Sequence, residues 1–214
     1  MKPLLVLRPE PGNRATVDRA RALRLDPVPC PLFAVEAVAW TVPRPRADYI
    51  LFTSANALRL GGEQLASLIT LPALAVGPAT ADAARDAGFD VAMTGDEGVD
   101  ALLVALPGTR RLLHLVGAEH RPALTRHAIE TVVIYRSVAL AGCVIPDGRL
   151  VALVHSPRAG ERFAEMVPER ANIAIAAIST AAAAACGTGW ATIEVADRPS
   201  DGALLALAAR LCQD

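Results

Sequence analysis

An internal repeat constrains the fold of this chain more than any other feature of its sequence. Ser156 lies 102 positions after Ser54, and this one offset, without insertions, aligns residues 49–57 with 151–159, residues 75–79 with 177–181, and residues 101–103 with 203–205. The two copies together cover roughly half of the chain. Such a period is too long for the short repeats of a solenoid, so the sequence predicts two similar domains.

Short apolar runs alternate with stretches rich in alanine and arginine. The runs predict six strands, at Leu4–Leu7, Tyr49–Phe52, Leu74–Val76, Leu112–Val116, Val151–Val154 and Ala174–Ile178. Helices are expected after most of them, at Ala15–Leu25, Ala55–Leu68, Ala79–Ala87, Gly160–Met166 and Ala181–Cys186. Because each run is apolar throughout, the strands are expected to be buried on both faces, as in a parallel sheet. The predicted fold class is therefore α/β, with two similar parallel-sheet domains.

Two β-prone segments are left outside the repeat, residues 29–36 before the first copy and residues 132–139 before the second. The first strand, Leu4–Leu7, has no partner ahead of the first copy, so we expect it to join the sheet of the second. One domain then becomes discontinuous: residues 1–33 and 139–214 form domain 1, and residues 34–138 form an inserted domain 2. The chain crosses between them twice, and the two leftover segments are expected to be extended connectors that lie side by side.

Composition excludes several classes of protein. Hydrophobic residues make up 53% of the chain and charged residues 20%, which favours a packed core over disorder. The formal net charge of -1 argues against a general nucleic-acid binder, so a polyanionic ligand would have to be held by local features. The longest apolar stretch, residues 173–186, is interrupted by Ser179 and Thr180 and falls short of a membrane span.

The cysteines and the N-terminus favour a cytoplasmic location. Cys30, Cys143, Cys186 and Cys212 are scattered and form no C-x-x-C pair, so they are expected to be reduced thiols. The apolar run at Leu4–Leu7 is too short for a signal peptide.

Polar residues follow the predicted strands at six points, most of them just before a helix. These residues are Arg8, Thr53 with Ser54, Gly77, Gly117, Ser156, and Ser179 with Thr180. The carboxyl ends of parallel strands share one edge of a sheet, and helices that begin there present unpaired backbone N–H groups that attract anions. We therefore expect an anion-binding cleft shared by the two domains. The alternative is that Ser54, Ser156 and Ser179 are plain N-caps.

Motifs for nucleotide, metal or serine-hydrolase chemistry are absent, so neither a cofactor nor a metal is expected. The histidines have no metal-ligand spacing. His120 with Glu119 suits either an acid–base pair or a solvated loop, and His155 suits either a ligand contact or a strand end. Tyr135, one of only two tyrosines, lies in the second leftover segment. Its hydroxyl group suits proton donation in a cleft, although a half-buried strand tyrosine fits the same pattern.

A set of short motifs, in order along the whole chain, resembles the uroporphyrinogen-III synthase family. The first-half motifs are residues 7–12 (LRPEPG), 31–33 (PLF), 52–57 (FTSANA) and 76–81 (VGPATA) with Gly88-Phe89. The second-half motifs are residues 115–117 (LVG), 133–136 (VIYR), 155–159 (HSPRA) and 177–179 (AIS). Each motif is weakly specific by itself, and the ordered set carries the resemblance.

The resemblance implies two flavodoxin-like α/β domains joined by a two-stranded ladder. It also implies a cytoplasmic lyase that needs no cofactor and converts hydroxymethylbilane, a linear tetrapyrrole with eight carboxylates. Loss of the terminal hydroxyl gives an azafulvene, and attack by the substituted carbon of the far ring gives a spiro intermediate. Fragmentation and re-closure then produce uroporphyrinogen III with ring D inverted. The enzyme's main task is to hold one geometry, because the substrate closes spontaneously to the type I isomer.

The resemblance places Tyr135 on the connector tyrosine of the family, which is thought to assist departure of the hydroxyl group. The predicted substrate-binding residues are Arg8, Thr53, Ser54, Asn56, Gly77, Gly117, Ser156, Arg158, Ser179 and Thr180. The chain departs from the family at 179–182, where Ser-Thr-Ala-Ala replaces a Gly-Pro followed by threonines. We expect a monomer that binds neither nucleic acid nor membranes. The competing function is a non-enzymatic, two-lobed binding protein that closes on a small anion.

Overall fold

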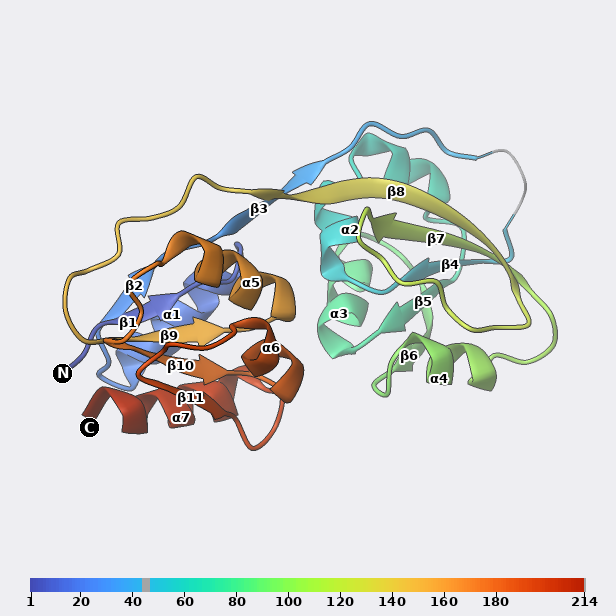
Figure 1. The fold of residues 1–214 in the computed structure, drawn as a ribbon. Helices are drawn as coiled ribbons and strands as arrows, with labels where there is room; N and C mark the ends of the chain where they lie inside the picture. The colour runs from blue at the N-terminus through green and yellow to red at the C-terminus, as the bar shows by residue number, and fades with distance from the viewer. Residues whose placement is uncertain (44–46, 214) are drawn as a thin grey trace. The chain divides into compact units, whose positions relative to one another are not determined.

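The computed structural model describes residues 1–43 and 47–213, and its contacts divide the chain into two units. Unit 1 combines both ends of the chain, residues 1–34 and 139–214, and unit 2 comprises residues 35–138. Each unit is built around one sheet of mostly parallel strands with helices on its faces (Figure 1). The predicted α/β class, with two parallel sheets, is confirmed.

Unit 1 contains a five-stranded sheet in the order β11-β10-β9-β1-β2. Its strands are β1 (Leu4–Val6), β2 (Pro27–Pro29), β9 (Leu150–Val154), β10 (Ile173–Ala177) and β11 (Thr192–Val195). Its helices are α1 (Gly12–Ala22), α5 (Pro157–Met166), α6 (Thr180–Ala185) and α7 (Asp201–Gln213). β1 pairs in parallel with β9, which confirms that the first strand joins the sheet of the second repeat.

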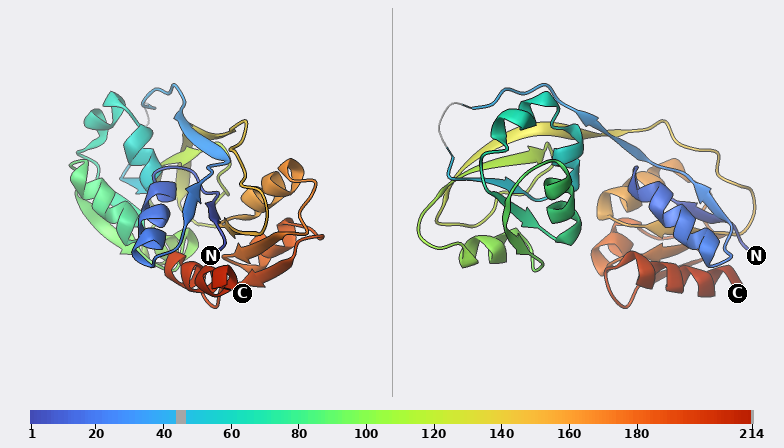
Figure 2. Two further views of the ribbon diagram at one scale, coloured as in Figure 1. Left: turned by 90° about the vertical axis from the view of Figure 1, so that its left-hand side faces the viewer. Right: turned by 180° about the vertical axis from the view of Figure 1, so that it is seen from behind.

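Successive residues of β1 face opposite layers of unit 1, as the period of a strand requires. Leu4 and Val6 pack with α1 and α7, which lie side by side on one face of the sheet (Figure 2). Leu5, on the opposite face, packs with α5 and α6, where Phe163 stacks on Trp190. This burial on both faces explains why the central strands carry no polar residues.

Unit 2 contains a six-stranded sheet in the order β3-β8-β7-β4-β5-β6. Its strands are β3 (Phe33–Ala37), β4 (Tyr49–Phe52), β5 (Ala73–Val76), β6 (Val91–Gly95), β7 (Arg111–Gly117) and β8 (Ala128–Ala139). Its helices are α2 (Ala55–Leu60), the 3-10 helix η1 (Glu63–Leu68), α3 (Pro78–Asp86) and α4 (Val99–Ala105). Ile50 and Phe52 face α2 and α3, and Leu51 faces α4.

The structural similarity of the two units covers more elements than the sequence repeat does. From the second strand outwards, the sheet order β8-β7-β4-β5-β6 of unit 2 matches the order β2-β1-β9-β10-β11 of unit 1. The offset of 102 positions also relates helix α4 to helix α7, which the sequence had not identified as helices. The two units therefore share this order of five strands.

Hydrogen bonds join each of the two segments left outside the repeat, residues 29–36 and 132–139, to a residue that follows just after the other. Val38 N–H donates to the carbonyl of Ile134 at 2.8 Å, and Leu140 N–H donates to the carbonyl of Leu32 at 2.9 Å. The residue numbers rise along one segment as they fall along the other, which is the pattern of an antiparallel pair. β3 and β8 are accordingly neighbours at the edge of the unit 2 sheet.

The sequence predicts one helix over Ala55–Leu68, and this prediction is wrong. The helix stops at Leu60 and resumes as η1 at Glu63. Gly62 has φ +70°, a left-handed conformation that breaks the helix and that glycine adopts without a steric penalty.

Among the described residues, no helix combines the length and hydrophobicity that crossing a bilayer requires.

The prediction of four reduced thiols is wrong for two of the cysteines. The fold brings Cys30, which follows β2, next to Cys143, which follows β8, and the two form a disulfide. Their Cα atoms are 5.2 Å apart although the residues are 113 positions apart in sequence, so no local spacing could reveal the pair. Cys186 and Cys212 are free and buried, and burial raises the pKa of both thiols, to about 11 for Cys186.

Thiol counting tests this pairing. Protein purified without reductant and then denatured should show two reactive thiols per chain, and four after reduction. Before denaturation neither free thiol should react quickly, because burial disfavours the thiolate that reacts. Four reactive thiols in the unreduced, denatured chain would contradict the disulfide.

Candidate functional site

A cavity of about 340 Å³ lies at the carboxyl edge of the unit 2 sheet. We call it the Tyr135 cavity. Gly117 lines it, together with the polar residues Thr53, Ser54, His114, Glu119, His120, Arg121 and Tyr135. Four of these residues, Thr53, Ser54, Gly117 and Tyr135, were predicted as site residues. The fold brings them together because β4, β7 and β8 are neighbouring strands. Thr53 and Ser54 follow β4, and Gly117, the last residue of β7, lies opposite Tyr135 of β8.

Thr53 and His114 are joined by a hydrogen bond within this lining. The parallel register pairs Leu51 of β4 with His114 of β7, and Thr53 lies two residues beyond Leu51 on the same face of the sheet. His114 Nε2 is consequently 3.1 Å from Thr53 Oγ1. The imidazole is only 3% exposed, so this bond compensates part of the cost of burying a polar ring.

Burial controls the charge of His114. Desolvation is the main cause that lowers its pKa, and the nearby His120 ring, with its centroid 6.4 Å away, lowers it further, to about 4. The imidazole is therefore neutral near pH 7, and one of its ring nitrogens donates while the other accepts.

Gly117 gives the ring of Tyr135 its position. The pairing of β7 with β8 is regular to Val116 and then shifts, so that Gly117 lies opposite Tyr135. A shift of this kind re-aims side chains at the end of a strand. The ring of Tyr135 occupies the space that a Cβ atom at Gly117 would need: such an atom would lie 2.8 Å from Cζ and closer still to Cε2. Glycine is therefore the only residue that fits without moving the tyrosine.

Ser54 caps helix α2, since its Oγ accepts a hydrogen bond from Asn56 N–H at 3.2 Å. A capping serine still has its own proton to donate, so this contact does not prevent it from binding a carboxylate. Asn56 lies in the first turn of α2, where its Oδ1 accepts from Arg59. Gly77, with φ +84°, precedes α3 and follows Val76, which lines the cavity.

The remaining predicted residues lie in unit 1. Arg8 follows β1, and Ser156 and Ser179 follow β9 and β10, where their side chains cap α5 and α6. Thr180 is the first residue of α6. The guanidinium group of Arg158 lies over the ring of Phe33, 4.4 Å from its centroid. The fold thus places the unit 1 residues along the carboxyl edge of their own sheet or in the first turn of a helix that begins there.

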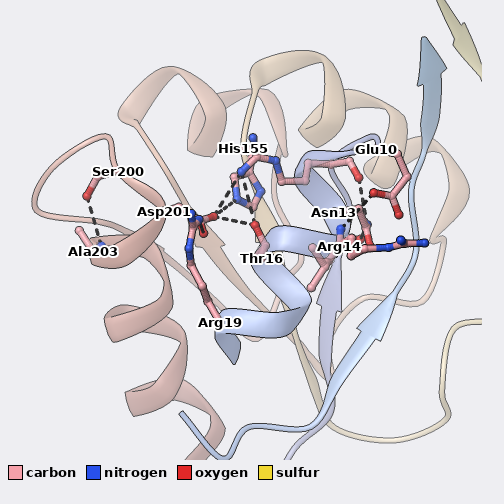
Figure 3. Close-up of polar contacts among 11 residues, drawn as sticks. Glu10, Asn13, Arg14, Thr16, Arg19, His155, Ser200, Asp201 and Ala203 are labelled. Carbon is pink, nitrogen blue, oxygen red and sulfur yellow. Dashed lines mark hydrogen bonds and ion pairs between the residues drawn. The ribbon is translucent and has the colours of Figure 1, made fainter. Parts of the chain in front are cut away.

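Unit 1 also contains a cluster of hydrogen-bonded polar side chains, which we call the Asp201 cluster (Figure 3). It consists of Asp201, Thr16, Arg19 and His155. Asp201 Oδ1 accepts from Thr16 Oγ1 at 2.8 Å and lies 2.9 Å from His155 Nε2. Its Oδ2 accepts from Arg19 at 2.7 Å. Arg8 approaches Oδ1 at 3.4 Å. The cluster ties β9, α1 and α7 together, although these elements are far apart in the sequence.

The environment keeps Asp201 ionised. Burial by itself raises the pKa of a carboxyl group, but the hydrogen bonds from His155, Arg19 and Thr16 outweigh it and hold the pKa of Asp201 below its usual range. A carboxyl group whose pKa is lower in the folded state stabilises that state above its unfolded pKa of 3.8, and this contribution is lost as the pH falls below that value.

Asp201→Asn should therefore destabilise unit 1 by about 1–3 kcal/mol at pH 7, because the asparagine leaves charged and buried partners poorly paired. Melting curves should show the largest difference from wild type above about pH 5, and a smaller one as wild-type Asp201 becomes protonated at lower pH. Asp197→Asn, at an exposed carboxylate in the preceding loop, is the matched control. Equal melting temperatures for all three proteins at pH 7 would contradict this role of the cluster.

Neither His114 nor Asp201 was predicted from the sequence as a site residue. His114 lies inside an apolar run, where a histidine has no distinguishing spacing, and Asp201 lies in a polar stretch at the start of a helix. A partial signal was available for His114, since it is the one polar side chain within the buried part of its strand, residues 112–117. Within residues 1–43 and 47–213, no group of three His, Cys, Asp or Glu side chains is arranged to hold a metal ion.

Comparison with known proteins adds independent information. The family model described as uroporphyrinogen-III synthase HemD matches residues 14–206. The structure resembles the crystal structure of uroporphyrinogen-III synthetase from Helicobacter pylori 26695, with a TM-score of 0.70, 18% identity, and coverage of 99% of this chain and 100% of that one. It also resembles a mutant uroporphyrinogen III synthase from the extremely thermophilic bacterium Thermus thermophilus, with a TM-score of 0.53, 17% identity and full coverage of both chains. A search of curated protein sequences gives no significant match.

Proposed function

Because the chain belongs to the uroporphyrinogen-III synthase HemD family, a family of hydro-lyases, we propose that it converts hydroxymethylbilane to uroporphyrinogen III with inversion of ring D. The family match over residues 14–206 is the observation that carries this proposal. The Tyr135 cavity supports it, because four residues predicted for this reaction line one cavity of unit 2.

Tyr135 is proposed to donate the proton that the departing hydroxyl group needs. The hydroxyl leaves as water while the electron pair of the pyrrole nitrogen forms the exocyclic double bond. The N–H proton that this nitrogen then loses returns to the tyrosinate through water, which gives the neutral azafulvene and restores Tyr135. The substituted carbon of the far ring then attacks the exocyclic methylene carbon to give the spiro intermediate. A phenol is a neutral donor, and in a cavity it acts at the one position where the leaving oxygen is held.

The Tyr135 cavity is proposed to hold one end of the substrate, since about 340 Å³ is too little for a whole tetrapyrrole. Thr53 and Ser54 supply hydroxyl donors for its carboxylates, and Arg121 supplies a cation at the rim. Asn56, Gly77 and Gly117 border the same edge of the sheet. Holding the chain end in one orientation favours the type III isomer over spontaneous closure to type I.

Unit 1 is proposed to contribute a second group of substrate contacts through Arg8, Ser156, Arg158, Ser179 and Thr180. Arg8 is the most suitable of these for a carboxylate. Its contacts with Thr16 and Asp201 are both 3.4 Å long, so an incoming carboxylate competes with weak hydrogen bonds. Ser156 and Ser179 accept backbone hydrogen bonds and keep their protons available for donation.

The protein is proposed to act in the cytoplasm as a monomer, without nucleic-acid or membrane partners. In a reducing compartment the Cys30–Cys143 pair would be subject to thiol exchange.

The test is an assay coupled to the upstream deaminase, read for isomer type after oxidation of the products. The expected result is uroporphyrinogen III in excess over the spontaneous type I product, at a rate unchanged by EDTA. A product no richer in type III than the uncatalysed mixture would contradict the enzymatic function and leave the two-lobed binding protein as the better explanation.

A further inference from the structure

His114 lies where the fold would otherwise place an apolar side chain. Its cross-strand neighbour on β4 is Leu51, and Leu112, two residues earlier on its own strand, packs in the same layer under α4. A leucine at this position would be buried without any need for a partner. The His114 side chain instead forms a hydrogen bond with Thr53 Oγ1. The presence of a histidine at this buried strand position therefore needs an explanation other than packing.

The hydrogen bond to Thr53 limits what that hydroxyl group can do. A threonine has one proton to donate, and a carboxylate can only accept. If Thr53 gives its proton to a substrate carboxylate, its oxygen can only accept from His114, so Nε2 must then carry the proton. If Nε2 is instead the acceptor, Thr53 has already used its proton and can offer the substrate only lone pairs.

We propose that His114 is a positioning residue that donates from Nε2–H to Thr53 Oγ1 and so directs the Thr53 proton into the Tyr135 cavity as a donor for a substrate carboxylate. This inference rests on the proposed function, because it takes the ligand of Thr53 to be an anion.

The surroundings of His114 are consistent with a neutral donor. Desolvation and the neighbouring His120 disfavour its charged form. His127, the other buried histidine of this unit, is used differently: its Nε2 lies 2.9 Å from the carbonyl of Leu103, and its Nδ1 accepts from Arg110 N–H. Both nitrogens of His127 are thus committed to the backbone, and it serves as a control.

The tautomer of His114 can be read directly by two-bond 1H–15N NMR of 15N-histidine-labelled protein near pH 7. The His114 signals are assigned by their absence from His114→Gln. We expect the Nε2–H pattern. The Nδ1–H pattern would overturn the proposal, whether or not the protein makes uroporphyrinogen III, so this result is separable from a failure of the proposed function.

Kinetics of variants provide the second test. His114→Gln keeps an amide N–H near the position of Nε2, whereas His114→Asn and His114→Phe do not. We expect KM within about 3-fold of wild type for His114→Gln, and a KM raised about 10- to 100-fold for His114→Phe, the range expected for loss of a hydrogen bond to a charged group. His127→Gln should leave KM unchanged.

A double variant separates positioning from loss of structure. If His114 acts through Thr53, Thr53→Val with His114→Phe should raise KM no more than Thr53→Val does alone. Melting temperatures show whether each variant folds. If His114→Phe does not fold, the KM of Thr53→Val still shows whether the Thr53 hydroxyl group binds the substrate. A wild-type KM for folded His114→Phe, or fully additive effects in the double variant, would overturn the proposal.

Discussion

Replacing Tyr135 by phenylalanine is expected to lower kcat about 10- to 100-fold, at or below the lower end of the range for general acid catalysis. The variant keeps the ring that packs over Gly117 and removes only the hydroxyl group proposed to donate to the leaving oxygen. Water can still replace the missing donor, which is why the loss is not complete. KM should change little, because the substrate carboxylates are proposed to bind other residues. Steady-state rates with hydroxymethylbilane measure both parameters.

The chain supplies a matched control for this change. Its only other tyrosine, Tyr49, begins strand β4 at the opposite end from Thr53, so Tyr49→Phe should keep the wild-type kcat. A kcat for Tyr135→Phe equal to that of Tyr49→Phe would reduce Tyr135 to a packing residue.

Gly117→Ala is expected to lower kcat at least as much as removal of the hydroxyl group does. The new methyl group would lie 2.8 Å from Cζ of Tyr135, so the ring must move away from its position over Gly117. A misplaced donor costs about as much as an absent one when the reaction depends on orientation. The displacement should also change the fluorescence or NMR signals of Tyr135, which connects the kinetic loss to its cause.

Gly202→Ala is the control for glycine replacement, because a Cβ atom there meets no other atom and the backbone is already helical. It should fold at least as stably as wild type and keep its activity. Wild-type activity of Gly117→Ala, with unchanged Tyr135 signals, would show that the close approach of ring and glycine has no role.

The repeat made most of the fold predictable. Strands buried on both faces appear in sequence as apolar runs, and β4, β5, β7, β9 and β10 lie within a residue of where those runs predict them. The strands that were missed are short and peripheral. β2 reads Pro-Val-Pro at the edge of its sheet, and β6 and β11 are mixed polar strands at the far edges. Such strands are defined by their partners, which sequence periodicity does not show.

The candidate site was predictable where it follows a strand end or lies in a leftover segment. Thr53 could be identified because parallel strands end at one edge, and this holds for any sequence with the same topology. Tyr135 was identified by its place in the second leftover segment and by the family resemblance. The link between Thr53 and His114 depends on the register of β4 against β7, and the Asp201 cluster depends on contacts between the two ends of the chain. The Cys30–Cys143 pair depends on long-range contacts of the same kind. None of these contacts leaves a pattern in local sequence.

The Tyr135 cavity of unit 2 is proposed to bind one end of the tetrapyrrole through Thr53 and Tyr135. The most direct measurement is a crystal structure with uroporphyrinogen III bound under anaerobic conditions. We expect a pyrrole ring in the cavity, with a carboxylate oxygen within hydrogen-bond distance of Thr53 Oγ1 and the Tyr135 hydroxyl directed at the macrocycle. A product molecule bound entirely by unit 1 residues, with the cavity free of ligand, would contradict the claim.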